Sequence, residues 1–416
     1  MIRFFTYIKT FLVLIASFVS LSILSCFLPS QTIKSNISKS AQDFLSAGTY
    51  PTAIINKKPC QLDNFTDALI LNQMFSIDRD SLIYSIIAVP SYMESSPVQS
   101  LYKVTQENKT HNNQYSRYWH GSTFFFRPFF LFLDYKGLQE FLYIFSSILF
   151  ILFVVLFNKK TNWLKTISIT VSLALVYGYV TLFSIQFSPV WIISLIASCF
   201  ILTKKNSPKQ LFLAFFIIGS ITCFFDLLTT PLISWGFPLL IYFTINKTDK
   251  FYELTKAYFI TGFTWCCGYL STWVTKWIMV FSFLGKNAFL NAIKQVQYRS
   301  SATDFNRVQA VLDNFQMLNY TFLSLILGCG LLLVIIGFSK KGVKKSFAYL
   351  LIAICPFLWY LVVANHSYMH FWFTYRLLFL FLLGTLFAFN EATSLSNIKK
   401  SMSKCFLWKR IPCNKK

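Results

Sequence analysis

The stretch from Gln139 to Lys160, QEFLYIFSSILFILFVVLFNKK, sets the character of this chain. It holds an almost unbroken apolar run, and an α-helix of about 20 such residues crosses the hydrocarbon core of a bilayer. The run ends at Lys159 and Lys160, and short cytoplasmic loops of membrane proteins are enriched in such basic residues. The stretch therefore predicts a transmembrane helix over 139–157 whose C-terminal end faces the cytoplasm.

The composition extends this interpretation to the whole chain. Of 416 residues, 55% are hydrophobic and only 13% are charged, and the mean hydropathy is +0.54. A soluble fold of this length needs a more charged surface, so we expect a multi-pass membrane protein. The net charge of +23 does not indicate a nucleic-acid partner, because the basic residues cluster in short loops between apolar runs.

We expect an all-α fold, a polytopic transmembrane bundle of about ten spans with a long loop between spans 1 and 2. Residues 1–28 form the first span; a cleaved signal peptide, or a lipoprotein signal ending before Cys26, is the alternative. Spans 2–7 occupy 139–284 and spans 8–10 occupy 320–390. The limits predicted for them are 139–157, 166–187, 188–203, 210–227, 231–245, 257–284, 320–338, 346–364 and 374–390.

Charge in the loops predicts the orientation. The loops at 158–165, 204–209 and 339–345 are rich in lysine, and the basic tail at 391–416 adds Lys399, Lys400, Lys404, Lys409, Arg410, Lys415 and Lys416. The alternate short loops carry no basic residue. Both termini are therefore expected in the cytoplasm of a cell-membrane protein. Two large segments then lie outside: 29–138, with interfacial helices, and the amphipathic segment 285–319.

The first candidate for chemistry is the stretch LDNFTDALILNQMF, residues 62–75. Asp63 or Asn64 caps a predicted helix, and Asp63 and Asp67, four residues apart, share one helical face. Two carboxylates there suit a general base or a cation site. The alternative is structural, because an acid in the first turn of a helix complements its dipole.

The stretch YSRYWHGSTFFFRPFF, residues 115–130, precedes span 2. Its aromatic side chains suit a membrane interface, where Arg117 and Arg127 would bind lipid phosphates. Anchoring does not require an imidazole followed by a glycine. His120 therefore favours a binding site over a simple anchor.

Two charged residues fall in or beside predicted spans. Asp226 ends an apolar run, and Lys276 lies eight residues inside the outer end of span 7. Ionisable residues at such depth are candidates for a functional site. The alternatives are that Asp226 reaches water at a helix end, and that Lys276 snorkels outwards or pairs with Asp226.

The stretch NHSYMHFWFTYR, residues 365–376, holds the last candidates. His366 and His370 are four apart, so a helix would place them on one face. No third ligand is evident, so we expect no metal there. Arg376, at the start of a span, suits an anionic ligand or a lipid headgroup.

The layout of a first span, a long outer loop with an acid pair at a helix start, and many spans with short inner loops resembles the GT-C superfamily of membrane glycosyltransferases. The stretches 62–75, 115–130 and 365–376 also make the chain similar to uncharacterised multispanning membrane proteins of low-GC Gram-positive bacteria. The resemblance implies sugar transfer on the outer face from a polyprenyl-phosphate sugar lipid to a cell-surface glycan or lipid acceptor. Asp63 or Asp67 would be the catalytic base. A divalent cation is compatible with the resemblance as a cofactor.

The resemblance also assigns the remaining candidates. Arg117, Lys276 and Arg376 would hold the lipid phosphate as it leaves, and His120 and His366 would donate to its oxygens. These groups would meet in one outer cavity.

Other functions are open on the sequence alone. A polymerase or ligase of surface polysaccharide also uses outer arginines, but usually with its large loop late in the chain. A lipid-linked-glycan flippase or other transporter would show internal repeats, and none is evident. A non-enzymatic assembly factor is the remaining alternative.

Overall fold

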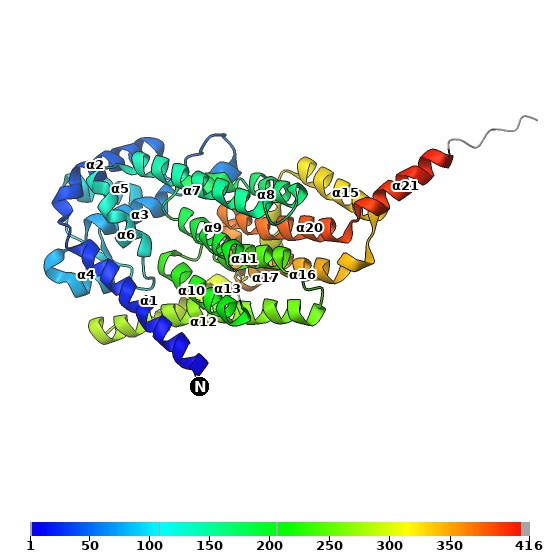
Figure 1. The fold of residues 1–416 in the computed structure, drawn as a ribbon. Helices are drawn as coiled ribbons and strands as arrows, with labels where there is room; N and C mark the ends of the chain where they lie inside the picture. Colours follow the sequence, from blue (N-terminus) through cyan, green and yellow to red (C-terminus); the bar gives the residue numbers. More distant parts are fainter. Residues whose placement is uncertain (1, 108, 205–206, 409–416) are drawn as a thin grey trace, which may run out of the picture.

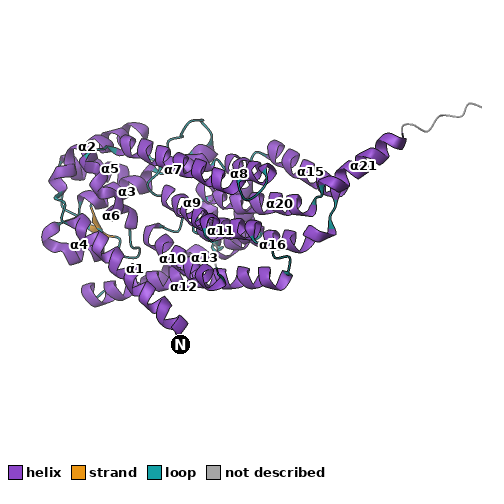
Figure 2. Ribbon diagram, viewed as in Figure 1, coloured by secondary structure: helices purple, strands orange, loops and turns teal. Residues whose placement is uncertain are grey.

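The computed structural model describes residues 2–107, 109–204 and 207–408. The fold in these ranges is nearly all helical (Figure 2). The exception is one antiparallel pair of two-residue strands, β1 (Pro90–Ser91) and β2 (Asn113–Gln114). The all-α prediction is confirmed.

Residues 29–134 form a compact unit at one end of the molecule, which we call the cap (Figure 1). It follows α1 (Ile2–Cys26). Its helices are α2 (Ser30–Ala47), α3 (Asn64–Phe75), α4 (Leu82–Ala88), α5 (Pro97–Gln106), α6 (Gly121–Phe126) and the 3-10 helix η3 (Arg127–Leu131). Apolar residues of α2, α3 and α5 share a core with Phe130, so the cap is packed like a soluble domain.

The remaining helices run along the length of the molecule as a bundle (Figure 1). It contains α7 (Tyr135–Asn158), α8 (Trp163–Leu175), α9 (Ser188–Thr203), α10 (Pro208–Phe225), α11 (Leu232–Ile245), α12 (Phe251–Leu284), α15 (Tyr320–Gly337), α16 (Val343–Ala353), α17 (Cys355–Val362) and α20 (Leu378–Ala392). The helices between and after these are η4 (Gly178–Phe183), α13 (Ala288–Ser300), α14 (Arg307–Gln316), η5 (Lys340–Gly342), α18 (Ala364–Met369), α19 (Phe371–Thr374), η6 (Tyr375–Leu377) and α21 (Leu395–Trp408).

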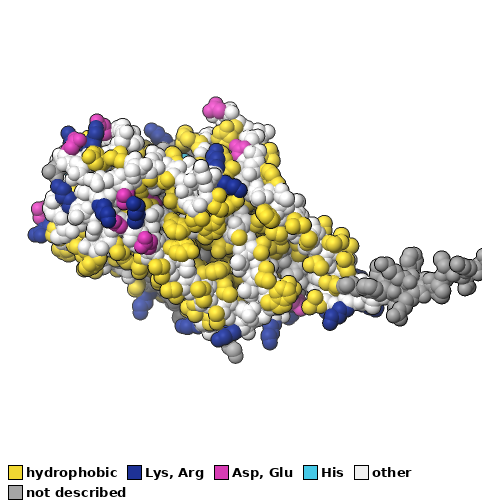
Figure 3. Space-filling view, turned by 90° about the horizontal axis from the view of Figure 1, so that it is seen from above, with side chains coloured by type: hydrophobic (Ala, Val, Ile, Leu, Met, Phe, Trp, Pro, Cys, Tyr) yellow, Lys and Arg dark blue, Asp and Glu magenta, His cyan; other side chains and the backbone are white. Residues whose placement is uncertain are grey.

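The protein is membrane-embedded. Among the described residues, six helices are long and apolar enough to span a bilayer: Phe4–Cys26, Tyr135–Asn158, Pro208–Phe225, Tyr320–Gly337, Lys340–Val362 and Phe371–Ala392. Large apolar side chains cover the outside of the bundle, and charged ones gather over the cap (Figure 3). Such an apolar exterior is stable in lipid and not in water.

One of the predicted spans is wrong in extent. The segment predicted at 166–187 is not a single helix, because α8 ends at Leu175 and Tyr177 adopts a left-handed backbone with φ 48°. An α-helix cannot continue through that conformation. The chain then proceeds as η4, which brings Gly178–Phe183 beside α7 and α9. The other predicted spans each coincide with helical structure.

Hydrogen bonds join several loops between helices at one end of the bundle. At the end away from the cap, the Lys165 ammonium binds the Glu391 carboxylate at 2.8 Å, and Lys345 donates to the carbonyl of Asn246 at 2.9 Å. The backbone N–H of Ser339 donates to the Ala392 carbonyl. The basic loops therefore share one end, as the charge pattern predicted. Lys205 and the tail residues Lys409, Arg410, Lys415 and Lys416 lie outside the described residues.

Two glycines let α10 and α12 pack closely against each other. A Cβ at Gly219 would lie 2.1 Å from the Trp265 carbonyl oxygen, and one at Gly268 would lie 2.0 Å from the Phe216 carbonyl oxygen. Ser220 donates to the Gly268 carbonyl at 3.1 Å across the same contact. Small residues at such crossings let helix backbones approach in membranes.

We expect Gly268→Ala to destabilise the bundle by about 2 kcal/mol, since a methyl group must push two backbones apart. Thermal unfolding of the detergent-purified chain measures this. Gly262→Ala is the matched control on α12, because the nearest atom to its Cβ would be 3.5 Å away, in the side chain of Trp235. Equal melting temperatures for the two variants would contradict the glycine contact.

Candidate functional site

Asp67 is the fully buried acid of the pair on α3, and it joins the cap to the bundle. Its carboxylate accepts from the Tyr135 hydroxyl at 2.5 Å and from the backbone N–H groups of Ile185 and Gln186 at 3.2 and 2.9 Å. Burial raises its pKa to about 7, although the Tyr135 hydroxyl lowers it. The bonding therefore gives Asp67 a structural role at the junction of cap and bundle, and its catalytic role stays a prediction.

Asp63 caps α3, as the sequence predicted, and its carboxylate has more free acceptor positions than that of Asp67. Its side chain accepts from Thr66, from the backbone N–H at 3.1 Å and from the hydroxyl at 2.7 Å, and also from the backbone N–H of Phe65. A carboxylate has about four acceptor positions, so Asp63 has some left. Burial raises its pKa to about 6, and the positive charge of Arg376 lowers it.

Arg376, whose charge acts on this acid, lies in the 3-10 helix η6 (Tyr375–Leu377) directly before α20 and is only 1% exposed. Its Nη2 donates to the backbone carbonyls of Pro59 and Gln61 at 3.2 and 3.5 Å. The guanidinium carbon lies 5.0 Å from the ring centre of Phe187. Its Nε and Nη1 are buried and have no hydrogen-bond partner among the described residues.

Unpartnered buried donors of this kind are rare, because each costs about 1–3 kcal/mol. In the described part of the chain, no ion pair within 4.0 Å joins Arg376 to Asp63. Arg376 is nevertheless near enough for its charge to lower the pKa of Asp63, and two of its nitrogens have no hydrogen-bond partner among the described residues.

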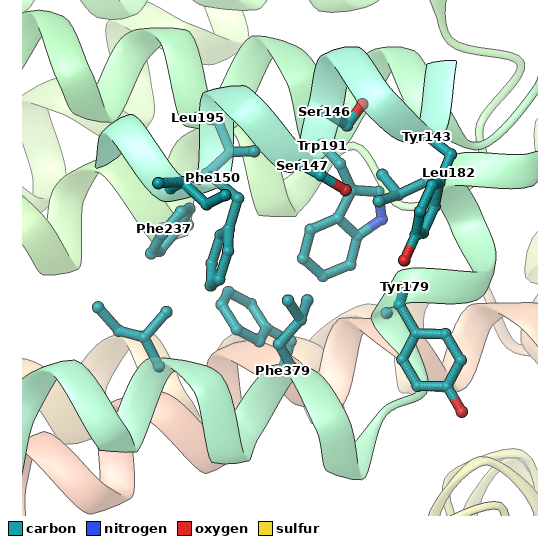
Figure 4. Close-up of a pocket in the computed structure, with 14 residues that line it drawn as sticks. Tyr143, Ser146, Ser147, Phe150, Tyr179, Leu182, Trp191, Leu195, Phe237 and Phe379 are labelled. Carbon is teal, nitrogen blue, oxygen red and sulfur yellow. The ribbon is translucent and has the colours of Figure 1, made fainter. Parts of the chain in front are cut away.

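An apolar groove of about 250 Å³ lies one helical turn deeper in the bundle (Figure 4). Trp191 follows Phe187 by four residues on α9, and Phe379 follows Arg376 by three on α20; both line the groove. On the rim, Ile151 of α7 is 62% exposed. We call this cavity the α7–α9 groove. It opens on the apolar side of the bundle and suits a hydrocarbon chain.

Arg127 does not bind a headgroup. It is fully buried, and its nitrogens donate to the carbonyls of Met74 at 2.7 Å, Ser25 at 2.5 Å and Leu28 at 2.7 Å, and to the Ser30 hydroxyl at 2.9 Å. Burial lowers its pKa to about 10. The expected phosphate-binding role is replaced by a structural one, because the guanidinium fastens the end of α1 to the cap.

The aromatic stretch 115–130 is mostly interior, which corrects the anchor interpretation. Trp119 is buried and donates to the Thr272 carbonyl at 2.7 Å, and Tyr118 stacks on Trp273. The stretch packs between the rest of the cap and α12, and it contacts protein instead of lipid headgroups. Only a few of its rings, such as Phe125, remain exposed.

The pair His120-Gly121 has a packing explanation. His120 takes a left-handed conformation, φ 56°, and its Nε2 bonds to the Tyr115 carbonyl at 2.8 Å. A Cβ at Gly121 would lie 2.5 Å from the Phe224 ring. Burial lowers the His120 pKa to about 3, so the ring is neutral, and its Nδ1 has no partner. The glycine lets α6 approach α10.

Lys276 and Asp226 do not pair. The Lys276 ammonium is fully buried and donates to the Ile86 carbonyl of the cap at 2.8 Å. Asp226 accepts from the backbone N–H groups of Leu228 and Thr229, the Thr229 hydroxyl and the Tyr269 hydroxyl. Its carboxylate therefore holds the turn after α10 and does not reach water.

The two histidines lie together on the other side of this turn. His366 Nε2 bonds to the Leu228 carbonyl at 2.9 Å, and the His370 ring is 4.8 Å from that of His366. Burial lowers the pKa of His370 to about 4. Among the described residues, no group of three His, Cys, Asp or Glu side chains is placed to hold a metal ion.

The predicted single cavity is therefore divided. Asp63 and Arg376 share one centre, while His120 and Lys276 are buried between the cap and α12. Arg117 lines a second cavity together with Arg299. Arg299 was expected only as part of the amphipathic segment 285–319. Its position at the end of α13, on the side that carries Ala292 and Gln295, was the signal available.

No protein-family model, curated protein or solved structure matches this chain.

We expect Arg127→Gln to destabilise the cap by about 3 kcal/mol, because three backbone carbonyls lose a charged donor in a buried site. Limited proteolysis between residues 29 and 134, followed over temperature, measures this. Arg79→Gln is the control, since Arg79 is exposed and its ion pair with Asp80 is 3.7 Å long. Unchanged protease resistance in Arg127→Gln would contradict the structural role.

Proposed function

We propose that this chain is a membrane glycosyltransferase with a GT-C-like arrangement of about ten spans. It would take a sugar from a polyprenyl-phosphate donor and transfer it, on the outer face of the cell membrane, to a surface glycan or lipid. The observation that carries the proposal is Arg376, whose buried guanidinium has two unpartnered nitrogens beside the partly free carboxylate of Asp63.

The proposed step needs one base and one group that accepts negative charge. Asp63 takes the proton of the acceptor hydroxyl, and the oxygen attacks the anomeric carbon of the donor sugar. The bond from that carbon to the phosphate oxygen breaks, and the polyprenyl phosphate leaves with the bonding electrons. The free N–H groups of Arg376 stabilise the charge on the phosphate.

The surroundings of the pair support this use. The α7–α9 groove begins one helical turn from Arg376 and is lined almost wholly by apolar and aromatic side chains, so the isoprenoid chain can lie there. Its rim is exposed on the lipid-facing side of α7. The lysine-rich loops lie at the far end of the bundle, so the positive-inside rule puts the cap and this pair outside and both termini in the cytoplasm.

We expect Asp63→Asn to lower sugar transfer by at least about 100-fold, which is the usual contribution of a general base. Arg376→Lys keeps the charge but loses the forked donors, and a loss of about 100-fold is expected. Transfer from radiolabelled polyprenyl-phosphate sugars in isolated membranes measures both. Asp80→Asn, an exposed change in the same cap, is the control. Normal transfer by Asp63→Asn, at equal protein level, would refute the proposed mechanism.

The pH profile should follow the ionisation of Asp63. Only the carboxylate can take a proton, and its pKa is raised by burial to about 6. The rate of the transfer step should therefore rise with pH and level off above about 7. Single-turnover measurements from about pH 5 to 8 test this. A rate that is flat or falls across that range would exclude Asp63 as the base.

A further inference from the structure

A second cavity, of about 370 Å³, lies between α12, α13 and the end of α17. Four tryptophans are among its lining residues, and we call it the tryptophan cavity. Its aromatic lining comprises Tyr118, Trp265, Tyr269, Trp273, Trp277 and Trp359. It shares no lining residue with the α7–α9 groove.

Two arginines give the tryptophan cavity a positive charge. The guanidinium carbons of Arg117 and Arg299 lie 5.4 and 6.0 Å from the ring centre of the same residue, Tyr118. No acidic side chain lines the cavity, and neither arginine belongs to an ion pair in the part of the chain that the structure describes. Asp226 lies behind the wall, where its carboxylate accepts from the Tyr269 hydroxyl at 3.2 Å, and it offsets only one of the two positive charges. Two cations against one acid favour an anionic ligand.

The unpartnered polar atoms of this cavity are all donors. Nε of Arg117, Nη1 of Arg299 and Nε1 of Trp359 are each buried without a hydrogen-bond partner. Three donors from three separate segments match an oxyanion with three acceptor oxygens, such as a phosphate monoester. A carboxylate has only two oxygens, in one plane.

Hydrogen bonds to neighbouring residues hold Arg117 in place. Its backbone carbonyl accepts from the indole N–H groups of Trp273 and Trp277 at 2.8 and 3.1 Å, and its Nη1 donates to Asn291 at 2.9 Å. The same bonds fix the orientation of the two indole rings, which line the cavity. A site whose donors are already oriented binds its ligand with a smaller loss of entropy.

The mouth of the cavity is apolar. Leu270 of α12, Val296 of α13 and Val362 of α17 line it and are each more than half exposed. A soluble anion gains nothing from such a rim, whereas a hydrocarbon chain buries it. The two arginines in the lining and the apolar mouth together favour an amphiphile that enters from the bilayer.

We propose that the tryptophan cavity is a binding site for a lipid with a terminal phosphate, whose oxygens are held by Arg117, Arg299 and Trp359 and whose chain leaves between α12 and α13. This site is separate from Asp63 and Arg376. The proposal goes beyond the sugar-transfer reaction and does not depend on it.

The test uses the full chain purified in a neutral detergent and 12-bromododecyl phosphate as the probe. Four of the ten tryptophans line the cavity, so a bromine atom in the bound chain should quench their fluorescence. We expect saturable quenching that unlabelled dodecyl phosphate reverses. Arg299→Gln should weaken the apparent affinity by about tenfold, since a charged hydrogen bond is lost.

Matched variants separate binding from other effects. Trp359→Phe keeps the ring but removes one N–H and should weaken binding by about threefold. Lys294→Gln removes an exposed charge from the same helix and should bind normally, as should Asp63→Asn, which tests sugar transfer separately. Arg299→Lys serves if the glutamine variant does not fold, and should still bind several-fold more weakly because it lacks the fork.

Three results would overturn the proposal. In the first, 12-bromododecanol quenches as well as the phosphate, which would mean partition without headgroup recognition. In the second, Lys294→Gln weakens binding as much as Arg299→Gln does, which would mean attraction to surface charge only. In the third, inorganic phosphate displaces the probe as effectively as dodecyl phosphate, which would make the site one for a soluble anion.

Discussion

The hydrogen bonds from the backbone of Ile185 and Gln186 to Asp67 position the candidate site. Asp67 lies one turn after Asp63 on α3, so fixing one carboxylate fixes the other. The next residue, Phe187, supports the guanidinium of Arg376 with its ring. A single buried carboxylate thus sets the position of both an acid from the cap and an arginine from the end of the bundle.

The same kind of contact recurs along the junction of the cap and the bundle. Arg127 and Lys276 are also buried charges, and each is met by backbone carbonyls from another segment instead of by an opposite charge. A buried charge costs several kcal/mol unless it is fully bonded, so these contacts hold only when the cap sits in one position. Arg376 differs from these two residues, because its Nε and Nη1 have no hydrogen-bond partner among the described residues, and the proposed function assigns it a ligand for that reason.

Hydropathy and charge predicted much of this fold. Short-range patterns predict the helical segments, the lysine-rich end and the N-cap of α3 at Asp63, and the structure retains all three. The errors concern burial. The pattern places Tyr118, Trp119 and Arg127 near a membrane, but it cannot distinguish an aromatic ring in the lipid interface from one packed between the cap and α12, since both surroundings are apolar. Likewise, no local pattern reveals the break at Tyr177, which depends on how η4 packs against α7 and α9.

At the junction between cap and bundle, only one partner of each hydrogen bond depends on the identity of its residue. Asp67, Arg127 and Lys276 recognise peptide groups, and every residue type presents the same carbonyl, as every one but proline presents the same N–H. Positions such as Ile86, Met74, Leu28 and Ile185 can therefore change identity over evolutionary time while the bond persists. Proteins of the same architecture can therefore differ widely at these positions. Their common ancestry would be detectable chiefly from a few scattered charged residues and from the order of the helices.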